Sequence, residues 1–135
     1  MIISSAKTKV RSAEEVSTLL KRVLEKEDAI SKDAEHFWVI SLKSNNCVIC
    51  IELISIGSLN NTCTHPREVF RRAIINGAAS IIVGHNHPSG ETTPSTEDRQ
   101  FTKRLKEVGE IVGIKLLDHI IIGENYFSFA DEGII

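Results

Sequence analysis

The segment from Ala79 to Gly84 constrains the fold more than any other, because it is short and almost wholly apolar. Such a run is typical of a strand buried at the centre of a sheet. Segments with helical and with extended patterns alternate before and after it. Such elements bury their apolar faces when the helices pack on a mixed sheet. The 135 residues suffice for one such unit. The sequence therefore predicts an α/β fold, a single domain with a mixed β-sheet flanked by helices.

Three helices are predicted from capping signals and apolar spacing. The tetrapeptide Ser12–Glu15 has the Ser-x-x-Glu pattern of a capping box, so the first helix begins there. Pro66 suits the first turn of the second helix, and Asn76-Gly77 ends it. The third helix opens at Ser95, and Gly109 is predicted to end it. The first helix has one apolar face at helical spacing, made of Val16, Leu19, Leu20, Val23 and Leu24.

Extended segments are predicted on both sides of the central strand. Phe37–Leu42 and Cys47–Ile56 are rich in β-branched and aromatic residues and are separated by a short polar turn, so they predict a hairpin. Ile111–Leu117, His119–Ile122 and Tyr126–Phe129 are predicted to be closing strands. Residues 1–11 are predicted to be a leader segment and 12–135 to be the domain.

Composition limits the classes of function. The chain has 16 Lys and Arg against 18 Asp and Glu, a net charge of −2, which does not support non-specific nucleic-acid binding. It has no apolar run of the length that a membrane span needs. Three cysteines are too few for a disulfide framework, and the N-terminus lacks the order of a signal peptide. We therefore expect a cytoplasmic protein that is not bound to a membrane.

The polar loop that follows the central strand carries the chemistry. His85 and His87 are two residues apart on extended backbone, so their side chains point to the same side. Pro88 turns the chain away, and Asp98 lies eleven residues after His87 in the first turn of the third helix. Two histidines and one carboxylate are a ligand set of catalytic zinc, which leaves a position for water and lowers that water's pKa toward neutrality. Ser95, at the start of the same helix, is placed to donate to an oxyanion.

Simpler explanations exist for each of these residues taken alone. Ser95 and Asp98 also form an ordinary capping pair. A His-x-His pair in a loop is weak evidence for a metal. His119 lies in an apolar strand pattern and is predicted to be a buried, hydrogen-bonded residue rather than a ligand. The combination of strand, His-x-His-Pro, loop and Ser-x-x-Asp nevertheless favours a metal site.

The segments His85–Pro88 and Ser95–Asp98 resemble the zinc signature of the JAMM (MPN-plus) metalloproteases, which reads His-x-His-Pro, a spacer and then Ser-x-x-Asp. The resemblance is closer to the RadC-like branch, and it covers the chain from about Ser12 onward. It implies a cytidine-deaminase-like (JAB/MPN) fold and one Zn²⁺ ion, with His85, His87 and Asp98 as ligands and Ser95 as the oxyanion helper. Four segments carry the closer match: His65–Phe70, His85–Gly90, Pro94-Ser95 and Leu116–His119.

The resemblance also implies a catalytic glutamate at the start of the first long strand, a place that Glu35 holds in this chain. Glu52 and Glu68 remain alternatives. Glu52 lies inside a strand pattern, and Glu68 lies in the first turn of a helix, where a carboxylate is useful against the helix dipole alone.

Three functions are compared. The first is a zinc-dependent metallopeptidase that hydrolyses a peptide or isopeptide bond in a protein or peptide substrate. The second is a catalytically silent JAB-fold interaction module linked to DNA repair or mobile-element DNA processing. Full-length RadC proteins carry an N-terminal helix-hairpin-helix region, which the residues before the first helix do not supply. The third, a zinc nucleobase deaminase, is disfavoured because the chain has no Pro-Cys-x-x-Cys segment.

Overall fold

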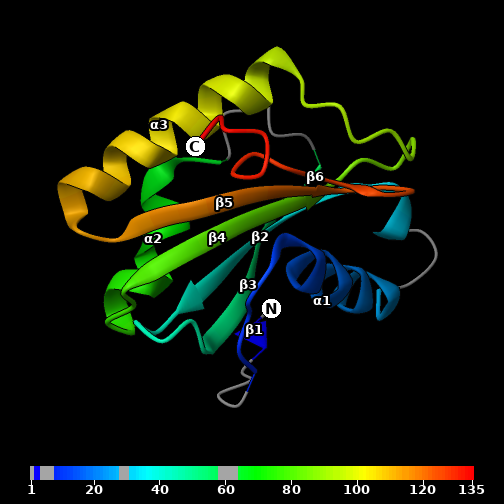
Figure 1. Cartoon of the computed structure of the whole chain (residues 1–135). Coiled ribbons are helices and arrows are strands. Elements are labelled where there is room, and N and C mark those ends of the chain that lie inside the picture. The colour runs from blue at the N-terminus through cyan, green and yellow to red at the C-terminus, as the bar shows by residue number, and fades with distance from the viewer. Residues whose placement is uncertain (1, 4–7, 28–30, 58–63) are drawn as a thin grey trace.

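A six-stranded mixed sheet runs through the described part of the chain, which covers residues 2–3, 8–27, 31–57 and 64–135 of a computed structural model (Figure 1). The order β1-β3-β2-β4-β5-β6 places β2 and β4 at the centre, which confirms the predicted fold class. The strands are β1 (Ile2–Ile3), β2 (Glu35–Leu42), β3 (Val48–Gly57), β4 (Ser80–Asn86), β5 (Lys115–Ile122) and β6 (Tyr126–Ser128). The helices are α1 (Ala13–Glu25), α2 (Pro66–Ile75) and α3 (Thr96–Val112), with a short 3₁₀ turn at Ser31–Asp33.

The strand directions bring distant parts of the chain to one edge of the sheet. β2 is antiparallel to β4, and their last paired residues at this edge are Phe37 and His85. The start of β2, with Glu35, therefore lies beside the end of β4. β4 and β5 are parallel, and α3 forms the crossover between them. The N-terminus of α3 follows the loop that leaves β4, so it is close to the same edge.

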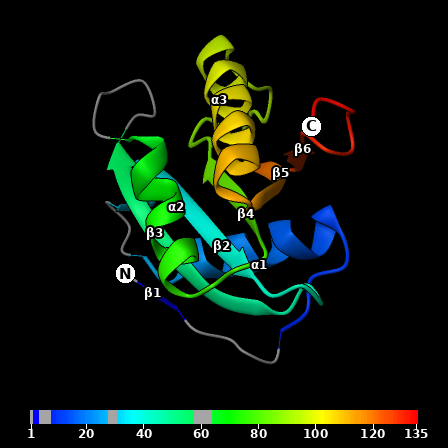
Figure 2. The ribbon, with the colours of Figure 1, turned by 90° about the vertical axis from the view of Figure 1, so that its left-hand side faces the viewer.

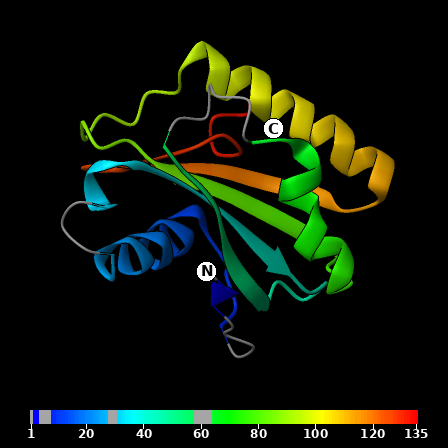
Figure 3. The same ribbon diagram turned by 180° about the vertical axis from the view of Figure 1, so that it is seen from behind.

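The two faces of the sheet bury separate cores (Figures 1 and 3). On one face, Leu20 of α1 packs in the core that contains Trp38. On the other face, Phe70 of α2 and Leu105 of α3 share a core with Phe37. Figure 2 shows α1 and α3 on opposite sides of the sheet. The neighbouring β2 residues Phe37 and Trp38 thus belong to different cores, because successive side chains of a strand point to opposite faces of the sheet.

Most of the predicted elements are confirmed. Ser12 caps α1, and its hydroxyl oxygen accepts a hydrogen bond from the amide of Glu15. Pro66 is the first residue of α2, and the predicted hairpin corresponds to β2 and β3. Among the described residues, the helices are all too short or too polar to cross a bilayer.

The predicted end of the third helix is wrong. Gly109 lies inside α3, which continues to Val112 and is capped by Gly113 in the left-handed conformation at φ 77°. The Gly113 amide donates to the carbonyl of Gly109, as is common for a glycine that ends a helix. Gly109 is needed for close packing instead, because a Cβ atom there would lie 2.5 Å from the carbonyl oxygen of Ile114.

The prediction of two strands at Ile111–Leu117 and His119–Ile122 is also wrong, since β5 runs through Asp118 without interruption. The Asp118 carboxylate is buried but accepts hydrogen bonds from the Ser128 hydroxyl and from the amide of Ala130. Burial raises the pKa of Asp118, against the effect of these hydrogen bonds. Asp118 can occupy the interior of the strand because the C-terminal segment provides hydrogen-bond donors to its buried carboxylate.

The predicted leader, residues 1–11, takes part in the fold where it is described. Val10 is buried in the core beneath α1. Its amide donates to the carbonyl of Asn46, and Lys9 forms a β-bridge with Cys47. The packed unit therefore begins before Ser12, because Val10 has apolar surface to bury.

We predict that Gly109→Ala destabilises the protein, although alanine is usually better than glycine in a helix by about 1 kcal/mol. The added Cβ would meet the backbone oxygen of Ile114 and lie 3.4 Å from the Phe70 ring. Backbone cannot move away as a flexible side chain can, so we expect a loss of about 1–3 kcal/mol. Urea unfolding measures this loss. Glu110→Ala, at the next and exposed position, is the control, and an unchanged or raised stability of Gly109→Ala would contradict the packing argument.

Candidate metal centre

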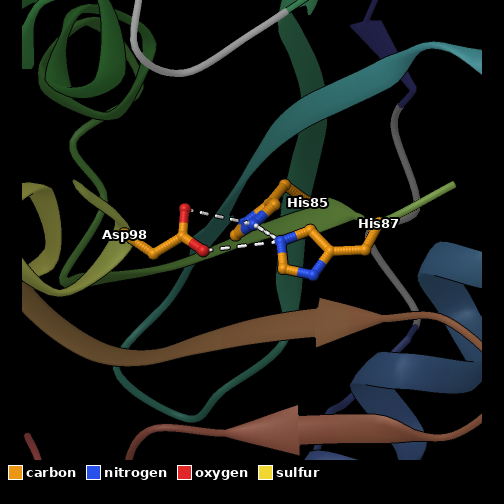
Figure 4. Close-up of side chains that lie close together, drawn as sticks. All are labelled: His85, His87 and Asp98. Carbon is orange, nitrogen blue, oxygen red and sulfur yellow. Dashed lines mark hydrogen bonds and ion pairs between the residues drawn. The ribbon is translucent and has the colours of Figure 1, made fainter. Parts of the chain in front are cut away.

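Three side chains converge at the edge of the sheet where β4 ends (Figure 4). The Nε2 atoms of His85 and His87 lie 3.0 Å apart. The two carboxylate oxygens of Asp98 each lie 3.4 Å from one of these nitrogens. His85 and Asp98 are buried, whereas the His87 side chain is 15% exposed. The structure therefore brings together the three residues expected to be ligands, in a group that opens toward solvent at His87.

The local fold sets the positions of both histidines. β4 ends at Asn86, and the His87 amide still donates to the carbonyl of Ile122, which continues the pairing with β5 by one residue. The loop then closes on itself, since the Gly90 amide donates to the carbonyl of His87. This arrangement holds the backbone of both histidines in extended geometry, so their rings share one side.

Asp98 is held by the first turn of α3. Ser95 is the N-cap residue, and its hydroxyl oxygen accepts the Asp98 amide at 3.0 Å. The Ser95 amide in turn donates to Asp98 Oδ2 at 2.9 Å, which completes a capping box. The ordinary capping role of this pair is thus present in the structure. Ser95 is exposed, and its hydroxyl oxygen is the acceptor of the Asp98 amide. The hydroxyl proton is not used in this hydrogen bond, so it remains available for donation to another group.

A chain of buried hydrogen bonds determines which nitrogen of His85 carries a proton. Thr102 donates its hydroxyl proton to the carbonyl of Asp98 at 2.6 Å, so toward His119 Nδ1, also at 2.6 Å, its oxygen can only accept. Complete burial lowers the pKa of His119, which is therefore neutral, with its proton on Nδ1. His119 Nε2 must then accept a proton from His85 Nδ1, 2.7 Å away. In the neutral His85 ring, Nε2 then carries a lone pair directed at the cluster.

The same argument applies to His87. Its Nδ1 lies 2.8 Å from the carbonyl oxygen of Glu91, and a carbonyl can only accept. The proton of the neutral ring is therefore on Nδ1, and Nε2 carries a lone pair. With both rings neutral, two lone pairs and a carboxylate then face one another, an arrangement that repels unless a proton or a metal cation lies between them. These residues fit a divalent metal ion, and hydrogen bonds from the far ring nitrogens are the usual support of metal-binding histidines.

The electrostatics of the cluster favour a positive species among these side chains, either a proton on a histidine or a metal ion in its place. Burial alone would raise the pKa of Asp98, but hydrogen bonds with His85 and His87 outweigh it and hold the pKa well below its usual range. The hydrogen bond with Asp98 raises the pKa of His87, against the effect of burial. The site therefore provides a permanent negative charge that favours a positive species between these side chains.

Of the three candidate glutamates, Glu35 is the one whose side chain lies beside this cluster. Its Oε1 lies 3.9 Å from His87 Nε2, and its side chain is 32% exposed. Of the other two candidates, Glu52 lies 3.6 Å from Arg72 and Glu68 lies 3.5 Å from Arg67. The expected place of Glu35, at the start of β2, is thus beside the histidines, because β2 and β4 are antiparallel.

Sequence reasoning predicted a buried, hydrogen-bonded His119, and the structure confirms it. It missed Thr102, whose contact with His119 joins α3 to β5. The only local signal for Thr102 is its spacing of four residues from Asp98, which is that of one helical turn.

These observations define the class of protein: the fold is that of JAB/MPN domains, and it is built around a possible metal site. The family described as the RadC-like JAB domain matches residues 10–134. The chain belongs to this family, which confirms the resemblance seen in the sequence.

Two relatives of high identity carry the name UPF0758 protein. A UPF0758 protein of Caldanaerobacter subterraneus is 56% identical over 125 residues, which are 92% of this chain and 52% of that protein. A UPF0758 protein of Desulforamulus reducens is 54% identical over 110 residues, 81% of this chain and 48% of that protein. The chain thus spans about half the length of these relatives.

We predict that Thr102→Val weakens the affinity of the candidate site for a divalent metal ion, with zinc as the probe, by about 10- to 100-fold, the usual effect of losing a group that supports a metal-binding histidine. Without the hydroxyl, His119 is free to place its proton on Nε2, which then opposes the Nδ1 proton of His85. Calorimetric titration with zinc measures the affinity. Thr18→Val is the matched control, because Thr18 makes the same contact with a carbonyl four residues earlier but touches no histidine. Wild-type affinity in folded Thr102→Val would contradict the assigned proton positions.

Proposed function

We propose that this protein is a zinc-dependent metallopeptidase of the RadC-like JAMM type, which hydrolyses a peptide or isopeptide bond. One observation carries the proposal: the side chains of His85, His87 and Asp98 converge, with the Glu35 carboxylate 3.9 Å from His87. A metal-binding group with a nearby free carboxylate is what hydrolysis of an unactivated amide requires.

The residues divide the reaction between them. His85, His87 and Asp98 hold the ion, and zinc bound there supplies a Lewis acid that makes water nucleophilic near neutral pH. Glu35 takes a proton from the attacking water and returns it to the departing nitrogen, as a general acid–base does. The Ser95 hydroxyl has a proton to donate to the oxygen of the scissile carbonyl as negative charge develops on it.

A substrate can approach from the side of His87. The side chains of His87 and Glu35 are 15% and 32% exposed, so the cluster meets solvent on their side. An open site of this kind suits a segment of polypeptide better than a base extruded from a nucleic acid, which needs a closed pocket. We therefore propose a protein or peptide as the substrate.

The first prediction of this proposal concerns the metal. Protein purified without chelators is expected to bind about one zinc ion per chain, because three ligands converge at one point. The double variant His85→Ala, His87→Ala is expected to bind none. Metal analysis by mass spectrometry measures both. Zinc-free wild type that cannot be loaded near neutral pH would end the proposal.

The second prediction concerns the base. In a library of short peptides derived from a proteome, zinc-loaded wild type is expected to cleave a subset, detected by mass spectrometry. Glu35→Gln is expected to cleave about 10²- to 10⁴-fold more slowly with zinc still bound, since it keeps the shape of the side chain but cannot take a proton.

Glu68→Gln is the matched control for this variant, and it should behave as wild type. Full cleavage by Glu35→Gln would remove Glu35 from the mechanism. If zinc-loaded wild type cleaves no peptide at all, the catalytically silent interaction module replaces the hydrolase.

A further inference from the structure

The residue between the two histidines has a separate set of contacts. Asn86 is 3% exposed, and alternation along the strand directs its side chain away from the rings of His85 and His87. A buried amide is costly unless its polar atoms are hydrogen-bonded. The partners of Asn86 therefore show what this side chain does.

Both partners flank Glu35. Asn86 Oδ1 accepts the backbone amide of His36 at 2.6 Å. Asn86 Nδ2 donates to the backbone carbonyl of Ala34 at 3.1 Å. The backbone pairing of β2 with β4 ends at Phe37, so the amide side chain continues the connection beyond the last paired residues. Glu35 is thus held on both sides by the residue that separates the two metal-binding candidates.

The Glu35 side chain has little else to hold it. Among the described residues, no hydrogen bond reaches its carboxylate, which is partly exposed and lies 3.9 Å from His87. Its position is therefore set by its backbone. The residue next to it is well fixed, since His36 is buried, stacks on Trp38 and has Nδ1 2.9 Å from the carbonyl oxygen of Ala34.

We propose that Asn86 is a positioning residue, a two-pronged clamp that holds Glu35 in register with the metal-binding histidines. The inference rests on the proposed function, in which Glu35 is the general base. A displacement of about 1 Å in a reacting group can lower a rate 10²-fold, so the clamp acts on turnover and not on metal binding.

A purely structural role for Asn86 makes a different prediction. It would lower stability but leave kcat of the folded, zinc-loaded protein unchanged. A clamp on Glu35 lowers kcat with little change in KM or zinc affinity. It also predicts that the effect of Asn86→Ala disappears when Glu35 has already been changed, because the two substitutions then remove the same contribution.

The experiment compares Asn86→Ala with wild type in the full chain loaded with zinc. We expect kcat on the cleaved library peptides to fall about 10- to 100-fold, zinc affinity to stay within about 3-fold, and exchange of the His36 amide proton to become faster. In the Glu35→Gln background, Asn86→Ala should cause no further loss. Asn76→Ala is the control, because Asn76 also makes a side-chain contact, with Cys50 Sγ at 3.5 Å, but caps α2 elsewhere.

Two results would overturn the clamp: an unchanged kcat in folded Asn86→Ala, or an equal fall in kcat in the Glu35→Gln background. If Asn86→Ala does not fold, Asn86→Asp replaces it. That variant has the same shape and keeps the acceptor for His36, so a smaller fall in kcat is expected and an unchanged kcat again overturns the proposal.

If zinc-loaded wild type cleaves nothing, the proposed function fails and the clamp is judged by structure. Crystals of zinc-loaded Asn86→Ala should then show the Glu35 carboxylate displaced from His87. An unmoved carboxylate with unchanged exchange of the His36 amide would contradict the clamp.

Discussion

The hydrogen-bond chain from Thr102 through His119 to His85 is the interaction on which the site depends. It lies in the buried layer between α3 and β5, where burial keeps His119 neutral. The Thr102 oxygen accepts the His119 Nδ1 proton, and His119 Nε2 accepts the His85 Nδ1 proton. The neutral His85 ring therefore has its lone pair on Nε2. A different proton arrangement would place a donor at the cluster and abolish its fit to a cation. The lone pair that His85 offers to the candidate metal site is therefore determined by Thr102 and His119, which lie outside the cluster.

Strand direction explains why the residues of the candidate site come from three distant segments. The sheet places the start of β2 beside the end of β4, and the crossover through α3 returns a helix N-terminus to the same edge. Each segment supplies its own group: the Glu35 carboxylate from the start of β2, two imidazoles from the end of β4 and the residue after it, and the Asp98 carboxylate from the first turn of α3. The capping box at Ser95 fixes the last of these by the same hydrogen bonds that begin the helix.

Local signals in the sequence predicted much of this arrangement, because capping boxes, strand alternation and a proline after a strand act over a few residues. They predicted the side-by-side histidines and the place of Asp98. Glu35 came from the family resemblance, since nothing local marks it. Thr102 and the partners of Asn86 could not be predicted, because their contacts join segments 17 to 52 residues apart. The predicted helix end at Gly109 was wrong because close packing can also require a glycine. The close contact here is with the carbonyl of Ile114, which the sequence alone does not show.

The alternation of β4 separates two tasks that one short segment must perform. His85 faces the layer of α3, where Thr102 and His119 control its proton, while Asn86 faces the other way and controls the backbone around Glu35. In the proposed mechanism, changes on the first side act on the lone pairs and so on metal affinity, and changes on the second side act on the position of a carboxylate and so on turnover. The two sets of buried partners lie on opposite faces of one strand, so the proposal assigns metal binding and general-base positioning to residues that can be changed separately.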